Sequence, residues 1–162
     1  MVILFGVIEF AFVFNASLSI EFATRDGALA AAEAGSTPGA DCSILKVVDA
    51  SVGAPADRNS ISEVRIYKSD PNGNPIGGVA NIYSRGGGGA CPNLPYKLVS
   101  GSYLDTNRCN VLATAVCGGV DTIGVQVTYV YAWKPPLARM LPMTGPGYTL
   151  TTNTAMRMEP VL

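Results

Sequence analysis

The sequence predicts an α+β fold in which one long hydrophobic N-terminal helix packs on a small antiparallel β-sheet. The first observation is a proline-free stretch, residues 1–37, whose leading part is strongly apolar. The second is the alternation of apolar and polar side chains in 121–133 and 148–158, which is typical of strands. The third is the concentration of glycine and proline after the alanine-rich segment, which indicates a loop-rich second part. We therefore divide the chain into an N-terminal helix, residues 1–35, and a globular domain, residues 36–162.

The N-terminal helix is predicted to cover residues 1–34. Its last part, "GALAAAEAG", is rich in alanine, and the helix should stop at Gly35 with Pro38 just beyond. Sixteen of the first 22 residues are apolar. At about 1.5 Å per residue, the first twenty residues cover about 30 Å, the thickness of a bilayer's hydrocarbon core. The sequence therefore predicts that residues 1–20 can enter a membrane.

Three interpretations of this segment remain open. A cleaved signal peptide would have a basic start and a small-residue cleavage site. The run "ALAAAEAG" imitates such a site, but no Lys or Arg precedes the apolar run. A plain membrane anchor is the second interpretation. The third is a helix that starts in the membrane and ends inside a polymer, and Glu9 favours it.

Glu9 is the one charged residue in the first twenty, and it would lie near the bilayer midplane. A charge at that depth costs about 2.5–3.5 kcal/mol, which a cation from another subunit would relieve. The Met1 amine of a neighbour would reach Glu9 if subunits were staggered by about 12 Å, and Arg25 would need about 24 Å. The alternative is that Glu9 takes up a proton in lipid and has no role in assembly.

Small side chains form a band along the same helix at spacings of three and four. Such a band lets another backbone approach closely, as in pairs of membrane helices. We therefore predict that the band contributes to assembly. Its members are Ala16, Ser19, Ala23, Gly27, Ala30 and Ala34.

The globular domain should begin with a short helix and a β-hairpin. The stretch "DCSILKVVDASV" has helical apolar spacing, with Asp41 as a candidate N-cap. Residues 61–84 are predicted to form a hairpin with a Pro-Asn-Gly-Asn loop. Asp70, Asn72 and Asn74 alternate as in a calcium loop, but a single carboxylate favours turn chemistry over a metal site.

The rest of the domain should be a glycine-rich loop followed by two paired strands. Residues 85–95, "RGGGGACPNLP", lack the strand–helix frame of a phosphate-binding loop, so we expect a flexible loop. Residues 121–133 and 148–158 are the predicted strands. They should pair with each other as partners in the sheet.

Four cysteines indicate an oxidising compartment. An even number of cysteines after an export-like segment favours two disulfides, and four buried free thiols are the alternative. Four cysteines allow about three pairings, of which we prefer the short Cys109–Cys117 loop. No C-x-x-C pair is present, so we expect no metal site. The four are Cys42, Cys91, Cys109 and Cys117.

Composition argues against catalysis and against nucleic-acid binding. The chain has no histidine, its carboxylates are scattered, and no nucleophile motif is present. The formal net charge of -1 gives no field that would attract a polyanion. We therefore expect no enzyme activity, no cofactor and no nucleic-acid partner.

Several segments, in a shared order, resemble one known protein family. Gly6–Phe10, "GVIEF", closes an apolar run, and Ala23–Leu29, "ATRDGAL", follows it. Residues 64–75, 121–131 and 155–162 are similar as well. Together they resemble the TadE-like pseudopilins, bacterial envelope proteins linked to tight-adherence pili. The resemblance implies membrane insertion of the helix, processing or assembly by a pilus machine, and a structural or priming role in a filament.

The expected function is therefore that of a structural subunit of an extracellular pilus-like filament. The helix would cross the inner membrane of a bacterial envelope once and then pack in the filament core. Its partners would be copies of itself or other pilins, together with the assembly machinery. The alternative is a monomeric, membrane-anchored surface adhesin or binding domain that presents Trp133 and the tyrosines. The small-residue band distinguishes them, because a lone anchor does not need it.

Overall fold

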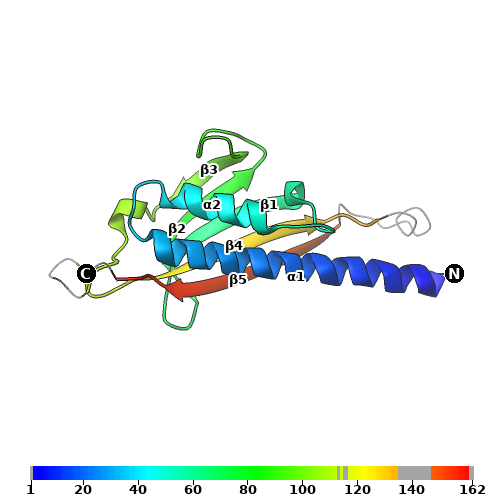
Figure 1. Cartoon of the computed structure of the whole chain (residues 1–162), viewed down its shortest axis with the longest axis horizontal. Helices are drawn as coiled ribbons and strands as arrows, with labels where there is room; N and C mark the ends of the chain where they lie inside the picture. The colour runs from blue at the N-terminus through cyan, green and yellow to red at the C-terminus, as the bar shows by residue number, and fades with distance from the viewer. Residues whose placement is uncertain (1, 113, 115–116, 135–146, 161–162) are drawn as a thin grey trace.

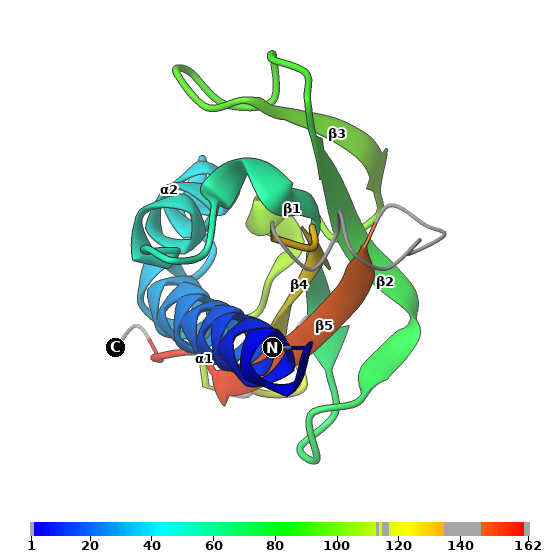
Figure 2. The ribbon, with the colours of Figure 1, turned by 90° about the vertical axis from the view of Figure 1, so that its right-hand side faces the viewer.

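The structure is a computed structural model that describes residues 2–112, 114, 117–134 and 147–160. Two helices pack on one face of a five-stranded sheet, with β1 at the centre of the strand order β3-β2-β1-β4-β5 (Figures 1 and 2). This confirms the predicted α+β fold with a long apolar N-terminal helix. The helices are α1 (Val2–Ala34) and α2 (Ala40–Ser51), with short 3-10 turns at Arg58–Ser60 and Asp105–Asn107. The strands are β1 (Ile61–Ser69), β2 (Pro75–Arg85), β3 (Tyr96–Gly101), β4 (Thr122–Tyr131) and β5 (Tyr148–Arg157).

The helix α1 is continuous and ends where the sequence predicts. Gly35 follows it with φ 58°, a left-handed conformation that glycine adopts without a Cβ clash. The chain then turns, and α2 begins after Gly39, whose φ is 84°. Asp41 was expected to cap α2, but this prediction is wrong. Asp41 lies inside the first turn and makes no capping hydrogen bond.

Asp41 is buried because it binds the sheet instead. Its carboxylate accepts hydrogen bonds from Asn81 (2.7 Å) and Tyr83 (2.6 Å) on β2, and it forms an ion pair with Arg108. The Arg108 guanidinium also lies over the Tyr103 ring at 4.8 Å. Buried polar groups of this kind need partners, so the network fixes the irregular segment after β3 against α2.

The β1–β2 hairpin confirms the prediction for residues 61–84. In its loop, Asp70 accepts hydrogen bonds from the backbone N–H of Asn72 and Asn74, at 2.9 and 2.8 Å. Hydrogen bonds from Asn74 lower the pKa of the Asp70 carboxyl. The alternation of Asp70, Asn72 and Asn74 therefore follows from turn chemistry.

The strands β4 and β5 pair antiparallel from Thr122 opposite Arg157 to Tyr131 opposite Tyr148, as predicted. The sequence did not predict β3, the edge strand next to β2. All of its residues after Tyr96 are exposed, so it lacks the apolar alternation that marks a half-buried strand.

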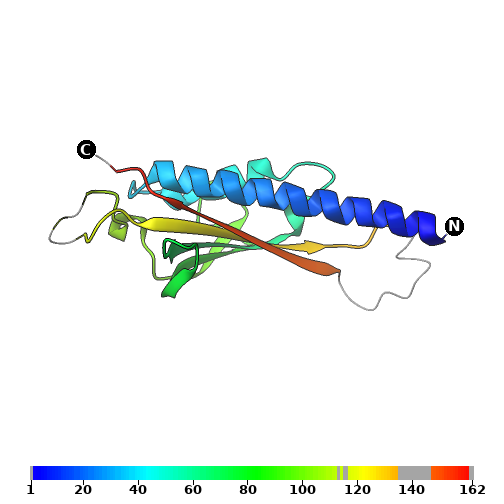
Figure 3. The same ribbon diagram turned by 90° about the horizontal axis from the view of Figure 1, so that it is seen from below.

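The core joins α1 to the rest of the chain. Ala16 and Ile20 are 1% and 0% exposed, and they belong to the same apolar cluster as Val64 and Val125 of the sheet. Residues of both predicted parts, 1–35 and 36–162, therefore share one apolar cluster. The middle and the end of α1 are part of the globular core, and α1 lies along the sheet (Figure 3).

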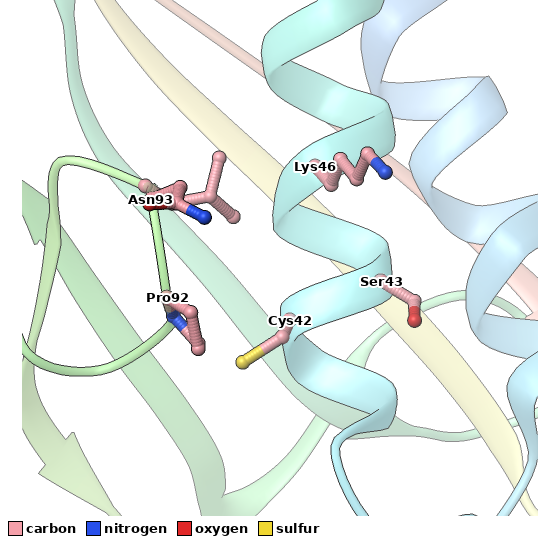
Figure 4. Close-up of a pocket in the computed structure, with 6 residues that line it drawn as sticks. Cys42, Ser43, Lys46, Pro92 and Asn93 are labelled. Atoms are coloured by element: carbon pink, nitrogen blue, oxygen red, sulfur yellow. The ribbon is translucent and has the colours of Figure 1, made fainter.

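Two disulfides are present, which confirms the prediction from the cysteine count. Cys42 pairs with Cys91, and Cys109 pairs with Cys117 as preferred from the sequence. The first bond holds the loop after β2 against α2. A cavity of about 290 Å³ lies between them, with Lys46 on its α2 side (Figure 4).

Candidate functional site

The inner face of α1 carries the small-residue band, and that band lies against the rest of its own chain. Ala16 and Ala23 are fully buried, whereas Ala30 and Ala34 are half-buried. A Cβ added to Gly27 would lie 2.5 Å from Cγ2 of Val48 in α2. Small side chains therefore allow a close approach here, but the approaching elements are α2 and β4.

Polar contacts fix the same face of α1. The Ser19 hydroxyl donates to the Gly53 carbonyl at 3.3 Å and accepts from the Gly53 N–H at 3.2 Å. The Thr24 and Thr152 hydroxyls are 2.7 Å apart, which ties α1 to β5. The band residues Ser19, Ala16, Ala23 and Gly27 are thus occupied within the chain. That the band contributes to assembly stays a prediction.

The outer face of α1 is apolar and uncovered along most of the helix. Leu4, Ala11, Leu18, Phe22 and Leu29 follow one another at spacings of seven, seven, four and seven, so they form one stripe. All five are exposed except Leu18, which is half-buried. The large apolar side chains that α1 exposes are Ile3, Leu4, Val7, Ile8, Phe10, Phe12, Phe14, Phe22 and Leu29.

Arg25 lies on this outer face between Phe22 and Leu29. It is exposed, and within the described part of the chain no carboxylate forms an ion pair with it. Glu21 and Glu33 are exposed on α1 as well. The outer face therefore combines an apolar stripe with charges of both signs.

Glu9 is buried at 5% exposure and has two donors within its own chain. The Tyr131 hydroxyl donates to its Oε1 at 2.7 Å, and the backbone N–H of Lys134 donates to the same oxygen at 3.0 Å. Burial and the hydrogen bond to Glu9 raise the pKa of Tyr131. The pairing of Glu9 with a cation from a neighbouring copy stays a prediction, and within its own chain Glu9 has these two donors.

Trp133 lies beside this pair and is half-buried. Its ring meets the Tyr131 ring edge-on, with centroids 6.0 Å apart. Together with Tyr148 it lines an apolar cleft of about 330 Å³ next to Glu9 and Phe10. Sequence reasoning missed this group because Tyr131 is 122 residues from Glu9, and no local pattern connects them.

Several tyrosines that the adhesin hypothesis would present are buried. Tyr96 and Tyr103 are almost fully buried and bind carboxylates, Asp49 and Asp121, at 3.3 and 3.2 Å. Their hydroxyls therefore complete the core. Among the described residues, no three Cys, Asp or Glu side chains gather as metal ligands would.

No family model, curated protein or solved structure matches this chain. Its described part has one helix, residues 3–34, that is long and apolar enough to cross a membrane. A signal sequence or the core helix of a soluble protein can have the same length and composition. The apolar helix and the two disulfides fit a membrane-associated protein of an oxidising compartment.

Proposed function

We propose that the chain is a structural subunit of an extracellular pilus-like filament. Its N-terminal helix enters the membrane before assembly and packs in the filament core afterwards. The observation that carries the proposal is the length of the uncovered apolar face of α1. From Ile3 to Leu29 this face extends for about 39 Å at about 1.5 Å per residue, which exceeds a hydrocarbon core of about 30 Å.

Lipid alone cannot cover a face of that length while the domain stays folded. Phe22 and Leu29 are both about half exposed, on the part of α1 whose Thr24 and Gly27 lie against β5 and β4. Apolar patches of this kind mark interaction sites on soluble surfaces. The stripe is typical of helices that pack side by side, so copies of the same helix are the partner that fits it.

Charge on the same face is consistent with helix-to-helix contact. Arg25 lies within the stripe, with Glu21 and Glu33 on the same helix. A stagger between copies would place the arginine of one subunit beside a carboxylate of the next. Such pairs contribute little affinity when exposed, but they favour one register over others. We therefore retain Arg25 as an assembly residue of the filament.

The rival function is a monomeric membrane-anchored adhesin, which would leave Phe22 and Leu29 in water. Exposed apolar area costs about 25 cal/mol per Å², so two large side chains without cover are unfavourable. The adhesin hypothesis also requires presented tyrosines, whereas Tyr96 and Tyr103 are buried and bind carboxylates. A filament covers Phe22 and Leu29 and requires no presented tyrosine.

The test is electron microscopy of cell-surface shear fractions, with a matched pair of double variants. Phe22→Glu with Leu29→Glu places carboxylates on the outer face of α1. Leu98→Glu with Val99→Glu places them on the edge strand β3, where the native side chains are similarly exposed.

We expect the α1 variant to accumulate as folded subunits without filaments, and the β3 variant to assemble normally. Filaments formed equally by both variants would contradict the proposal. Cells that show no filament containing the native chain would also contradict it.

A further inference from the structure

Among the described residues, hydrogen bonds from the globular domain reach α1 at Glu9, and the apolar residues 3–8 precede that contact. The end of β4 and the start of β5 lie beside this part of α1 (Figures 1 and 3). Tyr131 and Lys134 bind Glu9 there. Residues 3–8 lie beyond this contact, and five of the six are exposed.

This contact limits how far the folded chain can enter lipid. A bilayer core of about 30 Å needs about twenty helical residues. If residues 3–22 formed that span, it would include Ala16 and Ile20, which are 1% and 0% exposed in the core of the domain. Lipid could reach them only if the sheet moved away from α1.

Aromatic side chains gather at the level where the apolar residues 3–8 end. Trp133 and Tyr148 line the cleft beside Gly6, Glu9 and Phe10, and Tyr148 is 55% exposed. Tryptophan and tyrosine are enriched at membrane–water interfaces because one end of the ring system is apolar and the other binds water. Three features therefore occur at the same position along α1. They are the end of the exposed residues 3–8, the aromatic pair Trp133 and Tyr148, and the buried side chain of Glu9.

We propose that the lipid boundary crosses α1 at Glu9. Residues 3–8 lie among the acyl chains, Trp133 and Tyr148 lie at the headgroup level, and α1 from Phe12 onward lies outside the lipid. The Tyr131 hydroxyl and the Lys134 N–H stay on Glu9, so no unpaired carboxylate faces lipid. The chain thus contacts the bilayer in its folded form. This inference rests on the membrane stage of the proposed function and revises its depth.

The experiment uses Trp133, which is the only tryptophan of the chain. The full chain is incorporated in phosphatidylcholine vesicles that carry bromine at shallow or deep acyl positions, and fluorescence quenching is measured. Two relocated variants give the depth of α1. Each combines Trp133→Phe with a new tryptophan, Leu4→Trp in one and Phe14→Trp in the other. Both new sites are more than half exposed, so the fold tolerates the substitution.

We expect Trp133 to be quenched severalfold more by shallow than by deep bromine. Leu4→Trp should be quenched by deep bromine, and Phe14→Trp should lose that quenching. Deep quenching of Phe14→Trp equal to that of Leu4→Trp would overturn the boundary, because the span would then pass the domain. Quenching at none of the three sites would overturn the boundary together with the membrane stage. The filament itself is tested separately by the shear fractions, so the two failures are distinguishable.

Discussion

The packing of α1 on the rest of its own chain predicts how Gly27→Ala changes the free energy of unfolding. A Cβ at this position would lie 2.5 Å from Cγ2 of Val48 and 3.3 Å from Cγ1 of Val125. Val48 and Val125 are both fully buried. Room for the added methyl group therefore requires α1 to shift away from α2 and β4. Overpacking of this kind costs about 1–3 kcal/mol of the free energy of unfolding. Alanine gains about 1 kcal/mol over glycine in helix propensity.

Gly6 is the matched control, because it lies in the same helix with no heavy atom within 4 Å of its added Cβ. Gly6→Ala should therefore stabilise the chain by up to about 1 kcal/mol, whereas Gly27→Ala should be neutral or destabilising by up to about 2 kcal/mol. The difference between the two variants measures the packing cost alone, since the propensity term is common to both.

The assay is guanidinium unfolding of the full chain in a mild detergent, followed by Trp133 fluorescence. Extrapolation to zero denaturant gives the free energy of unfolding of each variant. If Gly27→Ala gains as much stability as Gly6→Ala, the band does not pack on α2 and β4 in solution. The band would then be available to another subunit, and assembly would not need the outer face of α1.

The two disulfides and one buried tyrosine also contribute to the free energy of unfolding. Cys42–Cys91 joins positions that are 49 apart, and its removal should lower the free energy of unfolding by about 4 kcal/mol. Cys109–Cys117 joins positions that are 8 apart, and its removal should lower it by about 2.6 kcal/mol. Guanidinium unfolding measures both losses. Equal losses would contradict the chain-entropy argument. Burial, and then the charge of the nearby carboxylate, raise the pKa of Tyr96 to about 12. Above pH 10 the native state therefore keeps the proton of the Tyr96 hydroxyl, whereas the unfolded state loses it. The contribution of Tyr96 to stability is thus complete below pH 10 and falls between pH 10 and 12. Tyr83, Tyr103 and Tyr131 also have raised pKa values, so Tyr96→Phe should reduce the fall in stability by the share of one tyrosine in a pH series of unfolding curves. An unchanged slope would contradict the prediction.

The long helix and the paired strands could be predicted because local patterns specify them. The absence of proline, the alanine-rich end and Gly35 define α1, and alternation defines β4 and β5. By contrast, every residue of the edge strand β3 after Tyr96 is exposed, so its sequence lacks an alternation of apolar and polar side chains. The N-cap prediction for Asp41 failed because three distant side chains bind its carboxylate.

The candidate site was predictable only in part. The small-residue band and Glu9 are visible in the sequence as unusual features of an apolar helix. What they contact depends on tertiary structure, because small residues allow any backbone to approach and an acid accepts any donor. The sequence therefore could not indicate that α2 and β4 cover the band, or that Tyr131 binds Glu9.

In the proposed filament, the outer face of α1 contacts copies of the same chain. The most direct measurement places a photoreactive benzophenone amino acid at Phe22, with Val99 on β3 as the matched site, in cells that produce the protein. Phe22 lies outside the proposed lipid boundary, so lipid does not shield it. We predict an ultraviolet-dependent ladder of multimers from Phe22 and monomer from Val99. Monomer from Phe22 in cells that carry filaments would contradict the account.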